Sequence, residues 1–575
     1  MTDSWEFGDG ARGEDAEENL AALADTIIDH WLARDPVTAT ALGDHRFDHR
    51  LPDLTAEGLE ESLTTLDHAL GAIDQVDDLA LSTDSLVDLE ILRARITGER
   101  FLLDTLAPHT WNPTVANPGT AIHLLLARDF APLEERLESV AGRLAGVPDL
   151  LETARESLTS MPRVHVETAI AQLRGTQAML GAQLDDELDR APSMRARLDP
   201  LRSTANGALE AHIGWLQDRL DSDLATRDPR LGPEKYAAKL WSTLDAEITP
   251  DDLLQRAEHD LVRAEGEIAR AAADYLGEPV PPPDDAAVLV RRALAAVAAS
   301  GPVDDSTVLP LCRAAYDSTR QFVIDQEIAS VPDIPVAIVE MPEIHRGVAV
   351  AYCDEPGALE TAPLTTFFAV APTPQGWDAD RVASFYREYN AFALQNLAVH
   401  EAMPGHVLQL GHSNALRHGN KVRAAFQSGA FAEGWAVYAE QVMADHRYVP
   451  AGTSAEDRHQ VALAIRLSQL KMRLRMTINT ILDIRVHTRG MTEEEALRLM
   501  QVRGHQEEGE AVGKWRRALL TSCQLSTYYV GFVAVDDVVR TLQAERPEWR
   551  EKQVHDAVLA HGSPPPRHLP ALLGL

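Results

Sequence analysis

Apolar residues at three- and four-residue spacing run through most of the first 280 residues, and this pattern limits the possible folds more than any other feature. Such spacing places apolar side chains on one face of an α-helix and leaves Glu, Asp and Arg on the other. The clearest segments are 59–79, 86–106, 132–158 and 164–188. Because no repeat of fixed period connects them, the pattern predicts packed helices rather than a solenoid.

Chain length sets the expected domain organisation. The 575 residues exceed the roughly 250 to 300 that one hydrophobic core supports, so we expect at least two packed subdomains. We predict a disordered N-terminus (1–18), a helical N-terminal region (19–330) and a C-terminal region (331–575) that carries the motifs described below. A proline-rich run at 278–285 cannot continue a helix and predicts a linker or long loop.

Three short runs of β-branched and aromatic residues stand between Pro and Gly at 336–341, 348–352 and 365–370. Runs of this kind predict strands, so we expect one small sheet inside a mainly α protein. We further expect 365–370 to be an edge strand, whose backbone groups could pair with an extended peptide.

The charge and cysteine content exclude several classes of protein. With 89 acidic and 53 basic side chains the formal net charge is -36, so the average surface repels nucleic acids and anionic membranes. Three widely spaced cysteines give neither a disulfide framework nor a Cys-x-x-Cys metal motif. Since no signal-like or membrane-spanning apolar stretch is present, we expect a cytoplasmic protein without a membrane partner.

The segment His400-Glu401-Ala402-Met403-Pro404-Gly405-His406 carries candidate metal ligands. On an unbroken helix, two histidines six residues apart are rotated by ~240° and separated by ~9 Å, too far to share one ion. Pro404 and Gly405 interrupt the helix between them and could turn His406 back towards His400. The helical pattern of 382–400 places His400 and Glu401 near the end of one long helix.

A second motif, Glu433-Gly434-Trp435-Ala436-Val437-Tyr438-Ala439-Glu440, opens a later helix. A catalytic zinc site needs about three protein ligands and a nearby carboxylate that accepts a proton from water. We expect His400, His406 and Glu433 to bind one zinc ion and Glu401 to be the general base. Glu440 lies seven residues after Glu433, on the same helix face, and could orient a ligand histidine.

These motifs together resemble the bacterial family called domain of unknown function 885, which is grouped with the gluzincin metallopeptidases. The resemblance extends to segments far from the two motifs: Asp35 to Gly43, then Asp483, Arg485, His487 and Gly490, then Gln524 and Tyr528 to Gly531. It implies a multi-helix, gluzincin-like architecture with a small β-sheet beside a metal cleft. It also implies hydrolysis of an amide with Glu401 as base.

The remaining candidates come from this resemblance for the oxyanion donors, and from side-chain chemistry for Asp483 and for a carboxylate-binding arginine among Arg473, Arg475 and Arg485. By analogy with gluzincins, Tyr528 or Tyr529 would donate a hydrogen bond to the developing oxyanion, with His487 as the alternative. Arg485 could bind the C-terminal carboxylate of a substrate, because a guanidinium binds carboxylates bidentately. Asp483 is expected to hold His487 or Arg485.

Several functions remain open at this stage. The leading expectation is zinc-dependent cleavage of short peptides by a carboxypeptidase, aminopeptidase or dipeptidase. The alternatives are a metal-dependent amidohydrolase acting on a non-peptide amide, and a catalytically inactive peptidase-like binding protein. The sequence leaves the oligomeric state open.

Overall fold

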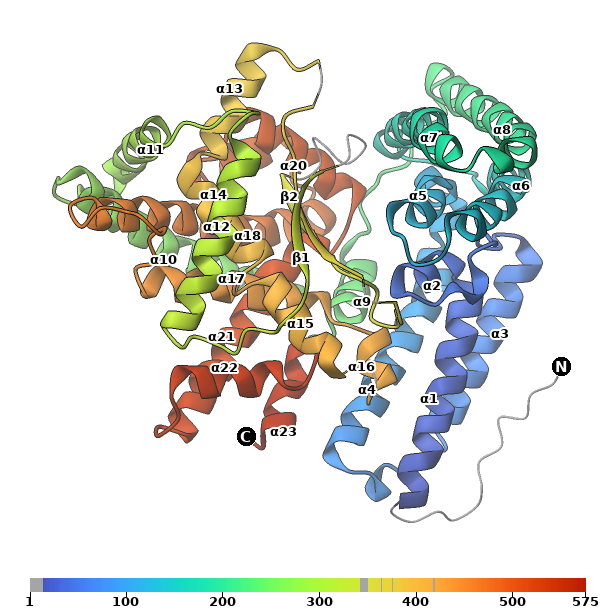
Figure 1. Cartoon of the computed structure of the whole chain (residues 1–575), viewed down its shortest axis with the longest axis horizontal. Coiled ribbons are helices and arrows are strands. Elements are labelled where there is room, and N and C mark those ends of the chain that lie inside the picture. The colour runs from blue at the N-terminus through green and yellow to red at the C-terminus, as the bar shows by residue number, and fades with distance from the viewer. Residues whose placement is uncertain (1–13, 342–349, 363, 375, 417–418) are drawn as a thin grey trace. The chain divides into compact units, whose positions relative to one another are not determined.

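The computed structural model describes residues 14–341, 350–362, 364–374, 376–416 and 419–575, and they form a mainly helical protein with one three-stranded sheet (Figure 1). The predicted fold class is therefore confirmed at this level. The predicted disorder at 1–13 falls outside the described residues, whereas 14–18 already belong to the first helix. No helix in the described part of the chain is both long and apolar enough to cross a membrane.

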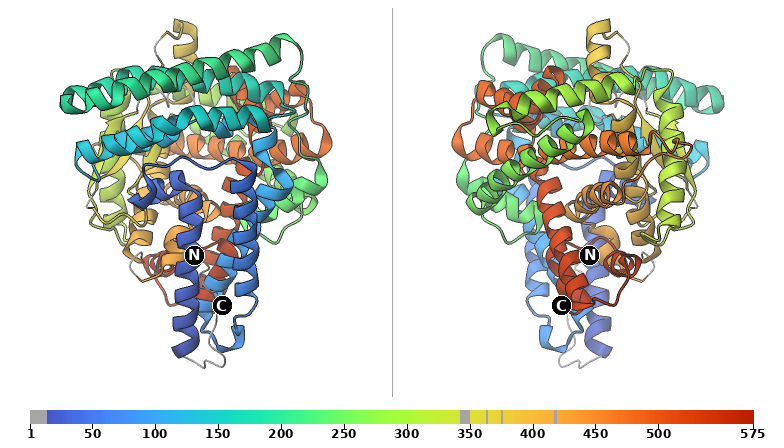
Figure 2. Two further views of the ribbon diagram at one scale, coloured as in Figure 1. Left: turned by 90° about the vertical axis from the view of Figure 1, so that its right-hand side faces the viewer. Right: turned by 90° about the vertical axis from the view of Figure 1, so that its left-hand side faces the viewer.

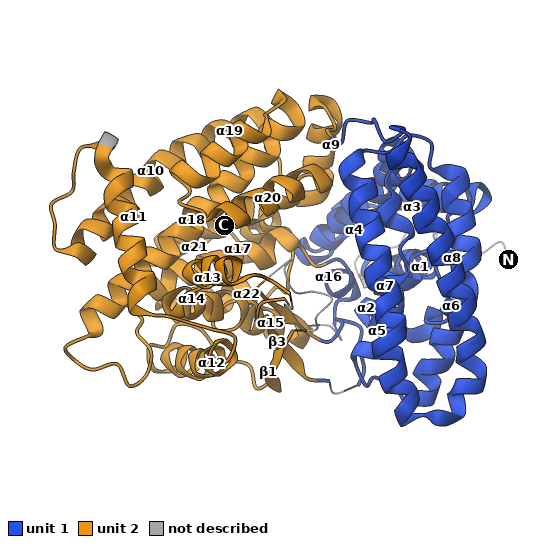
Figure 3. Cartoon of the chain, turned by 90° about the horizontal axis from the view of Figure 1, so that it is seen from above, with its two compact units in different colours: residues 1–229, 356–364, 419–426 blue, residues 230–355, 365–418, 427–575 orange. Residues whose placement is uncertain are grey.

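The chain forms two compact units (Figure 3). Unit 1 comprises residues 1–229, 356–364 and 419–426, and unit 2 comprises 230–355, 365–418 and 427–575. The sequence suggested a division near residue 330, but the structure divides the chain about a hundred residues earlier. The reason is that helices between 233 and 325 bury their apolar faces in the core of unit 2.

The regular elements of unit 1 in its described residues are helices. Its core lies among α5 to α8 and includes Leu137, Leu144, Leu180 and Leu209. Figure 2 shows the long helices of residues 133–221 running across the direction of the first blue helices. The helices are α1 (Glu14–Arg34), α2 (Pro36–Leu42), α3 (Ala56–Ile73), α4 (Thr83–Phe101), α5 (Gly119–Ala127), α6 (Leu133–Ser157), α7 (Arg163–Arg190), α8 (Arg195–Asp221) and α16 (Lys421–Ala425).

A buried polar network holds α2 in unit 1. Arg143 Nη2 donates to Thr40 Oγ1 at 2.6 Å, and Thr40 Oγ1 donates to Asp48 Oδ1 at 2.6 Å. His45 then bridges two carboxylates, with Nδ1 2.9 Å from Asp48 Oδ2 and Nε2 3.0 Å from Glu360 Oε2. Burial alone lowers the pKa of His45, but the hydrogen bonds to the two carboxylates outweigh burial and raise that pKa above 6.5.

This bridge makes the stability of unit 1 depend on pH. The pKa of His45 is higher in the folded than in the unfolded chain, so its stabilisation is fully present below pH ~6.5 and is lost as pH rises through the raised folded value. We expect His45→Gln to lower Tm by a few degrees at pH 6, about 1 kcal/mol, and by less at pH 9. Thermal melts of both proteins across this range check the prediction. A difference in Tm that grows with pH would contradict it.

Unit 2 contains the sheet and the remaining helices. Its long helix α18 runs through a large apolar core that includes Leu474, Ile478 and Leu482. The helices are α9 (Pro233–Leu244), α10 (Pro250–Leu276), α11 (Pro283–Ser300), α12 (Val308–Asp325), α13 (Ala379–Glu388), α14 (Ala391–Glu401), α15 (His406–Leu416), α17 (Gly429–Asp445), α18 (Arg458–Arg489), α19 (Glu493–Arg498), α20 (Glu508–Leu520), α21 (Thr527–Glu545), α22 (Glu551–Leu559) and α23 (Leu569–Leu573). Residues 278–282 of the predicted proline-rich loop lie between α10 and α11, whereas 283–285 form the start of α11.

The sheet has the strand order β1-β3-β2, from β1 (Val336–Glu340), β2 (Ala351–Asp354) and β3 (Thr366–Val370). β1 runs parallel to β3 with Ile338 opposite Phe368, and β2 runs antiparallel to β3 with Tyr352 opposite Ala369. The predicted sheet is confirmed, although residues 348 and 349 of the second expected strand lie outside the described part. The prediction that 365–370 is an edge strand is wrong, because β3 is paired on both sides.

The segment 382–400 does not form the single helix that its apolar spacing predicts. Helix α13 ends at Glu388 and α14 starts at Ala391. Asn390 begins the second helix, because its side chain accepts hydrogen bonds from the backbone N–H groups of Phe392 and Ala393. A local polar cap thus overrides the apolar periodicity that continues through it.

Candidate metal centre

His400 and Glu401 are the last two residues of α14, and His406 is the first residue of α15. The chain turns sharply between them, since a Cβ on Gly405 would lie 1.9 Å from the carbonyl oxygen of His400. The indole Nε1 of Trp435 donates to the carbonyl of Pro404 at 2.8 Å and holds this turn. The break places the two imidazoles edge to face, with ring centroids 4.9 Å apart.

Glu433 reaches the two histidines from the first turns of α17. This helix packs closely against α21 through Gly434 and Gly531, where a Cβ on Gly434 would lie 2.2 Å from the carbonyl carbon of Gly531. Only glycine permits such a close backbone approach. The glycine contact therefore positions the helix that carries Glu433.

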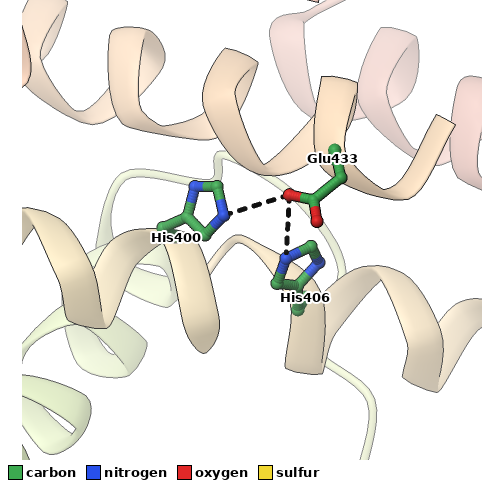
Figure 4. A group of neighbouring side chains, drawn as sticks. All are labelled: His400, His406 and Glu433. Carbon is green, nitrogen blue, oxygen red and sulfur yellow. Dashed lines mark ion pairs between the residues drawn. The ribbon is translucent and has the colours of Figure 1, made fainter. Parts of the chain in front are cut away.

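His400, His406 and Glu433, named here the His-His-Glu group, point towards one another (Figure 4). Glu433 Oε2 lies 3.4 Å from His400 Nε2 and 3.6 Å from His406 Nε2, and one ligand atom from each residue lies within 4.8 Å of the others. Two atoms bound to one zinc ion at ~2.0 to 2.1 Å and the tetrahedral angle are themselves about 3.3 Å apart. The observed separations are close to that spacing and longer than most hydrogen bonds.

Two further properties of the group fit a divalent cation. Glu433 Oε2 is buried and has no hydrogen-bond partner among the described residues. Burial opposes charge on His400, yet the neighbouring carboxylates of Glu433 and Glu440 raise the pKa of this imidazole well above 6.5. A positive charge is therefore favoured next to Glu433, and a divalent cation would supply that charge in place of a proton.

Glu440 orients His400 from the far side of the ring. Its Oε1 lies 2.8 Å from His400 Nδ1, and its Oε2 accepts a hydrogen bond from Asn396 Nδ2 at 2.7 Å. Glu440 is 2% exposed, so this interaction is shielded from water. With Nδ1 engaged in this way, Nε2 is the ring nitrogen that faces His406 and Glu433.

Replacing Glu440 by Gln is expected to weaken zinc binding about 10- to 100-fold, the usual effect of losing such a partner. The amide oxygen of Gln can still accept a hydrogen bond from His400. The amide nitrogen then replaces the oxygen that lies 2.7 Å from Asn396 Nδ2, so that two donors face each other. Competition with a fluorescent zinc chelator measures the change. Asp445→Asn is the matched control, because Asp445 lies on the same helix and pairs with Arg466; equal affinities of the two variants would contradict the assigned role.

Glu401 follows His400 and is bound from the sheet. The backbone N–H of Cys353 in β2 donates to Glu401 Oε2 at 3.0 Å. The carbonyl of Val350 accepts from Ala371, so alternation along β2 directs the backbone groups of Cys353 away from β3 and towards α14. The strand thereby fixes the orientation of the carboxylate beside the His-His-Glu group.

Tyr528 lies on the first turn of α21, where this helix packs against α17. Burial and the nearby carboxylates of Glu433 and Glu401 raise the pKa of Tyr528 to about 12, although Arg517 opposes the shift. The phenol therefore stays protonated at neutral pH and is able to donate a hydrogen bond close to the His-His-Glu group.

The structure places the two other expected oxyanion donors elsewhere. Tyr529 donates to Asp260 Oδ2 at 2.7 Å and thus faces α10. His487 Nε2 lies 2.9 Å from the carbonyls of Ala518 and Thr521, and its Nδ1 accepts from the N–H of Leu231. Both nitrogens are engaged and burial lowers the pKa of His487, so the ring is a buried structural group.

Arg485 is also unsuited to its expected role. Its side chain is 39% exposed and pairs with Glu258 at 2.6 Å. Asp483 lies 3.9 Å from His487, but its hydrogen bonds come from Ser526 Oγ at 2.8 Å and the N–H of Cys523 at 3.2 Å. Asp483 therefore does not hold Arg485. It stabilises the turn that precedes Tyr528.

Sequence reasoning missed two residues near the group. Asn396 supports Glu440, and its position four residues before His400, on the same helix face, is a signal that could have revealed it. Arg517 on α20 donates to Gln524 Oε1 at 2.8 Å and contacts Tyr528. No local pattern singles out Arg517, because its position near Tyr528 depends on the tertiary arrangement of the helices that carry the two residues.

The fold and this group define the class of protein. It is a mainly helical protein in which the end of one helix, the start of the next and a third helix bring together two histidines and a glutamate. A further carboxylate, Glu401, is held beside them by a strand. Residues 36–573 match the family model described as "Bacterial protein of unknown function (DUF885)", and the chain belongs to this family. No curated protein matches the chain significantly.

Two solved structures have the same fold. A "putative lipoprotein of unknown function" from Shewanella oneidensis is 26% identical, with a TM-score of 0.80 over 96% of this chain and 98% of that chain. A "putative lipoprotein" from Colwellia psychrerythraea is 16% identical, with a TM-score of 0.78 over 97% and 98% of the two chains. The second match concerns the fold alone.

Proposed function

We propose that this protein is a gluzincin-like zinc metallopeptidase that hydrolyses short peptides. The observation that carries the proposal is the convergence of His400, His406 and Glu433 within 4.8 Å, with Glu401 next to the first ligand. The group offers three ligands and a carboxylate, the set that metal-assisted hydrolysis of an amide requires. A zinc ion held there would lower the pKa of a bound water and polarise the scissile carbonyl.

The side chains around the group then have distinct tasks. Glu401 accepts a proton from the attacking water and passes it to the leaving amine nitrogen, while Cys353 N–H keeps its carboxylate in place. Tyr528 donates a hydrogen bond to the carbonyl oxygen as negative charge develops on it.

A peptide library tests the proposal directly. The full chain is loaded with one equivalent of zinc and incubated with peptides of two to ten residues, and cut positions are mapped by mass spectrometry. We expect cleavage that stops on chelation and returns with added zinc. Cleavage of acyl amino acids but not peptides would instead indicate an amidohydrolase, and zinc binding without hydrolysis would indicate a peptidase-like binding protein.

A further inference from the structure

Four cationic side chains gather on α18 and α20 in a chain whose net charge is -36. Lys471 pairs with Glu388 at 2.7 Å, Arg475 pairs with Glu510, and Lys514 lies 3.7 Å from Glu510. Arg517 acts electrostatically on both Glu510 and Lys514. We name the basic members, Lys471, Arg475, Lys514 and Arg517, the cationic cluster.

The cationic cluster carries more positive charge than its carboxylates neutralise. Four basic groups face two acids, Glu388 and Glu510, which leaves an excess of 4 − 2 = 2 charges when all are ionised. Burial and the neighbouring Arg475 lower the pKa of Lys514 to about 7, so the excess at neutral pH is between one and two charges. An anion brought to this place would be stabilised.

Arg517 is the member of the cluster closest to Tyr528. It lies in the last turn of α20, is half-buried, and donates to Gln524 Oε1 at 2.8 Å. It also lies close enough to the phenol of Tyr528 to lower the pKa of that group. Both partners are neutral, and within the described residues no ion pair joins Arg517 to a carboxylate. By contrast, Arg485 is paired with Glu258.

Tyr528 connects Arg517 to the His-His-Glu group. The backbones of α17 and α21 touch where a Cβ on Gly531 would lie 1.9 Å from the carbonyl oxygen of Ala430. Tyr528 lies one turn before Gly531, and Glu433 lies one turn after Ala430. Glu433 and Arg517 therefore both act electrostatically on the same phenol, that of Tyr528.

We propose that Arg517 binds the free C-terminal carboxylate of a peptide whose scissile bond lies at the His-His-Glu group, so that the substrates are peptides cut close to their C-terminus. This inference rests on the proposed function. A guanidinium suits the task because it binds a carboxylate through two parallel hydrogen bonds. Each extended residue spans at most about 3.6 Å, so an anchor this close to the ligands selects bonds near the chain end.

A binding experiment tests the proposal without depending on turnover. The full chain carries Glu401→Gln to prevent cleavage, is loaded with zinc, and is titrated by calorimetry with acetyl-Ala-Ala-Phe or its C-terminal amide. We expect Arg517→Met to weaken binding of the acid about 10- to 100-fold and to leave the weaker binding of the amide unchanged. Arg517→Lys keeps the charge without the two parallel bonds. Its affinity for the acid should therefore lie between that of the parent protein and that of Arg517→Met.

Arg516→Ala is the matched control, because Arg516 is exposed and adjacent on the same helix. Equal losses for acid and amide would overturn the proposal and assign Arg517 to positioning Tyr528, and no loss for the acid would also overturn it. If Arg517→Met does not fold, Arg517→Lys decides by the same comparison. Zinc content and peptide cleavage by the unmodified chain report on the proposed function separately, so its failure is distinguishable from that of the carboxylate anchor.

Discussion

Glu401→Gln is expected to lower kcat for peptide cleavage by about 10² to 10⁴-fold while zinc remains bound. Gln keeps the size of the side chain and an oxygen that accepts the hydrogen bond from Cys353, which is 3.0 Å from Glu401 Oε2. It loses the capacity to take up a proton at neutral pH. The loss should therefore appear in kcat, with only a small change in KM.

The experiment compares kcat, zinc content and Tm of the two proteins. Glu493→Gln, in the first turn of α19, serves as the control for a charge change outside the group, and its kcat should equal that of the unmodified protein. Turnover by Glu401→Gln within about threefold of the original would remove Glu401 from the mechanism, whereas loss of zinc would give it a structural role instead.

His406→Ala is expected to abolish stoichiometric zinc binding and the stabilisation that accompanies it. Removal of this ring leaves one histidine and one carboxylate, which is fewer than the three protein ligands of catalytic zinc sites. At a zinc concentration of about a thousand times Kd, binding contributes about 4 kcal/mol to stability. The unmodified chain should therefore melt several degrees higher with zinc than with chelator, and the variant should show no such difference.

Elemental analysis of the purified proteins and paired melting curves check this outcome. His412→Ala is the matched control, since His412 lies on the same helix α15 and contacts the carbonyl of Ser330 rather than the His-His-Glu group. One zinc ion per chain in His406→Ala, with a normal rise in Tm, would show that His406 is not a ligand and would undermine the proposed function.

Local patterns predicted a large part of this architecture. Apolar spacing predicted the helices of unit 1, and alternating β-branched runs predicted the sheet. The proline-glycine pair between His400 and His406 predicted the break that brings the two rings together, because proline lacks the backbone N–H donor and its ring clashes with the preceding helical turn. The same local reasoning failed at 382–400, where the side chain of Asn390 caps a new helix inside an uninterrupted apolar pattern.

The unit boundary and the roles of single side chains did not follow from local patterns. The sequence pattern predicted that α9 to α12 continue the N-terminal helical region. In the structure their apolar faces complete the core of unit 2. The sequence pattern predicted β3 to be an edge strand. In the structure β1 and β2 pair with its two sides, so β3 is the central strand. Pairing of strands and choice of core depend on segments far apart in sequence, and apolar spacing does not encode them.

The sequence by itself determined where helices start and break and which residue types are available to hold a metal ion, because proline, glycine, capping groups and apolar spacing act within a few residues. Only the tertiary structure decided which of two adjacent tyrosines lies near the His-His-Glu group. It also decided that Arg485, but not Arg517, pairs with a carboxylate of the described residues. Neighbouring residues on a helix point about 100° apart, so packing of α21 against α17 and α10 separates Tyr528 from Tyr529. Likewise, Glu258 neutralises Arg485, whereas Arg517 faces two neutral side chains.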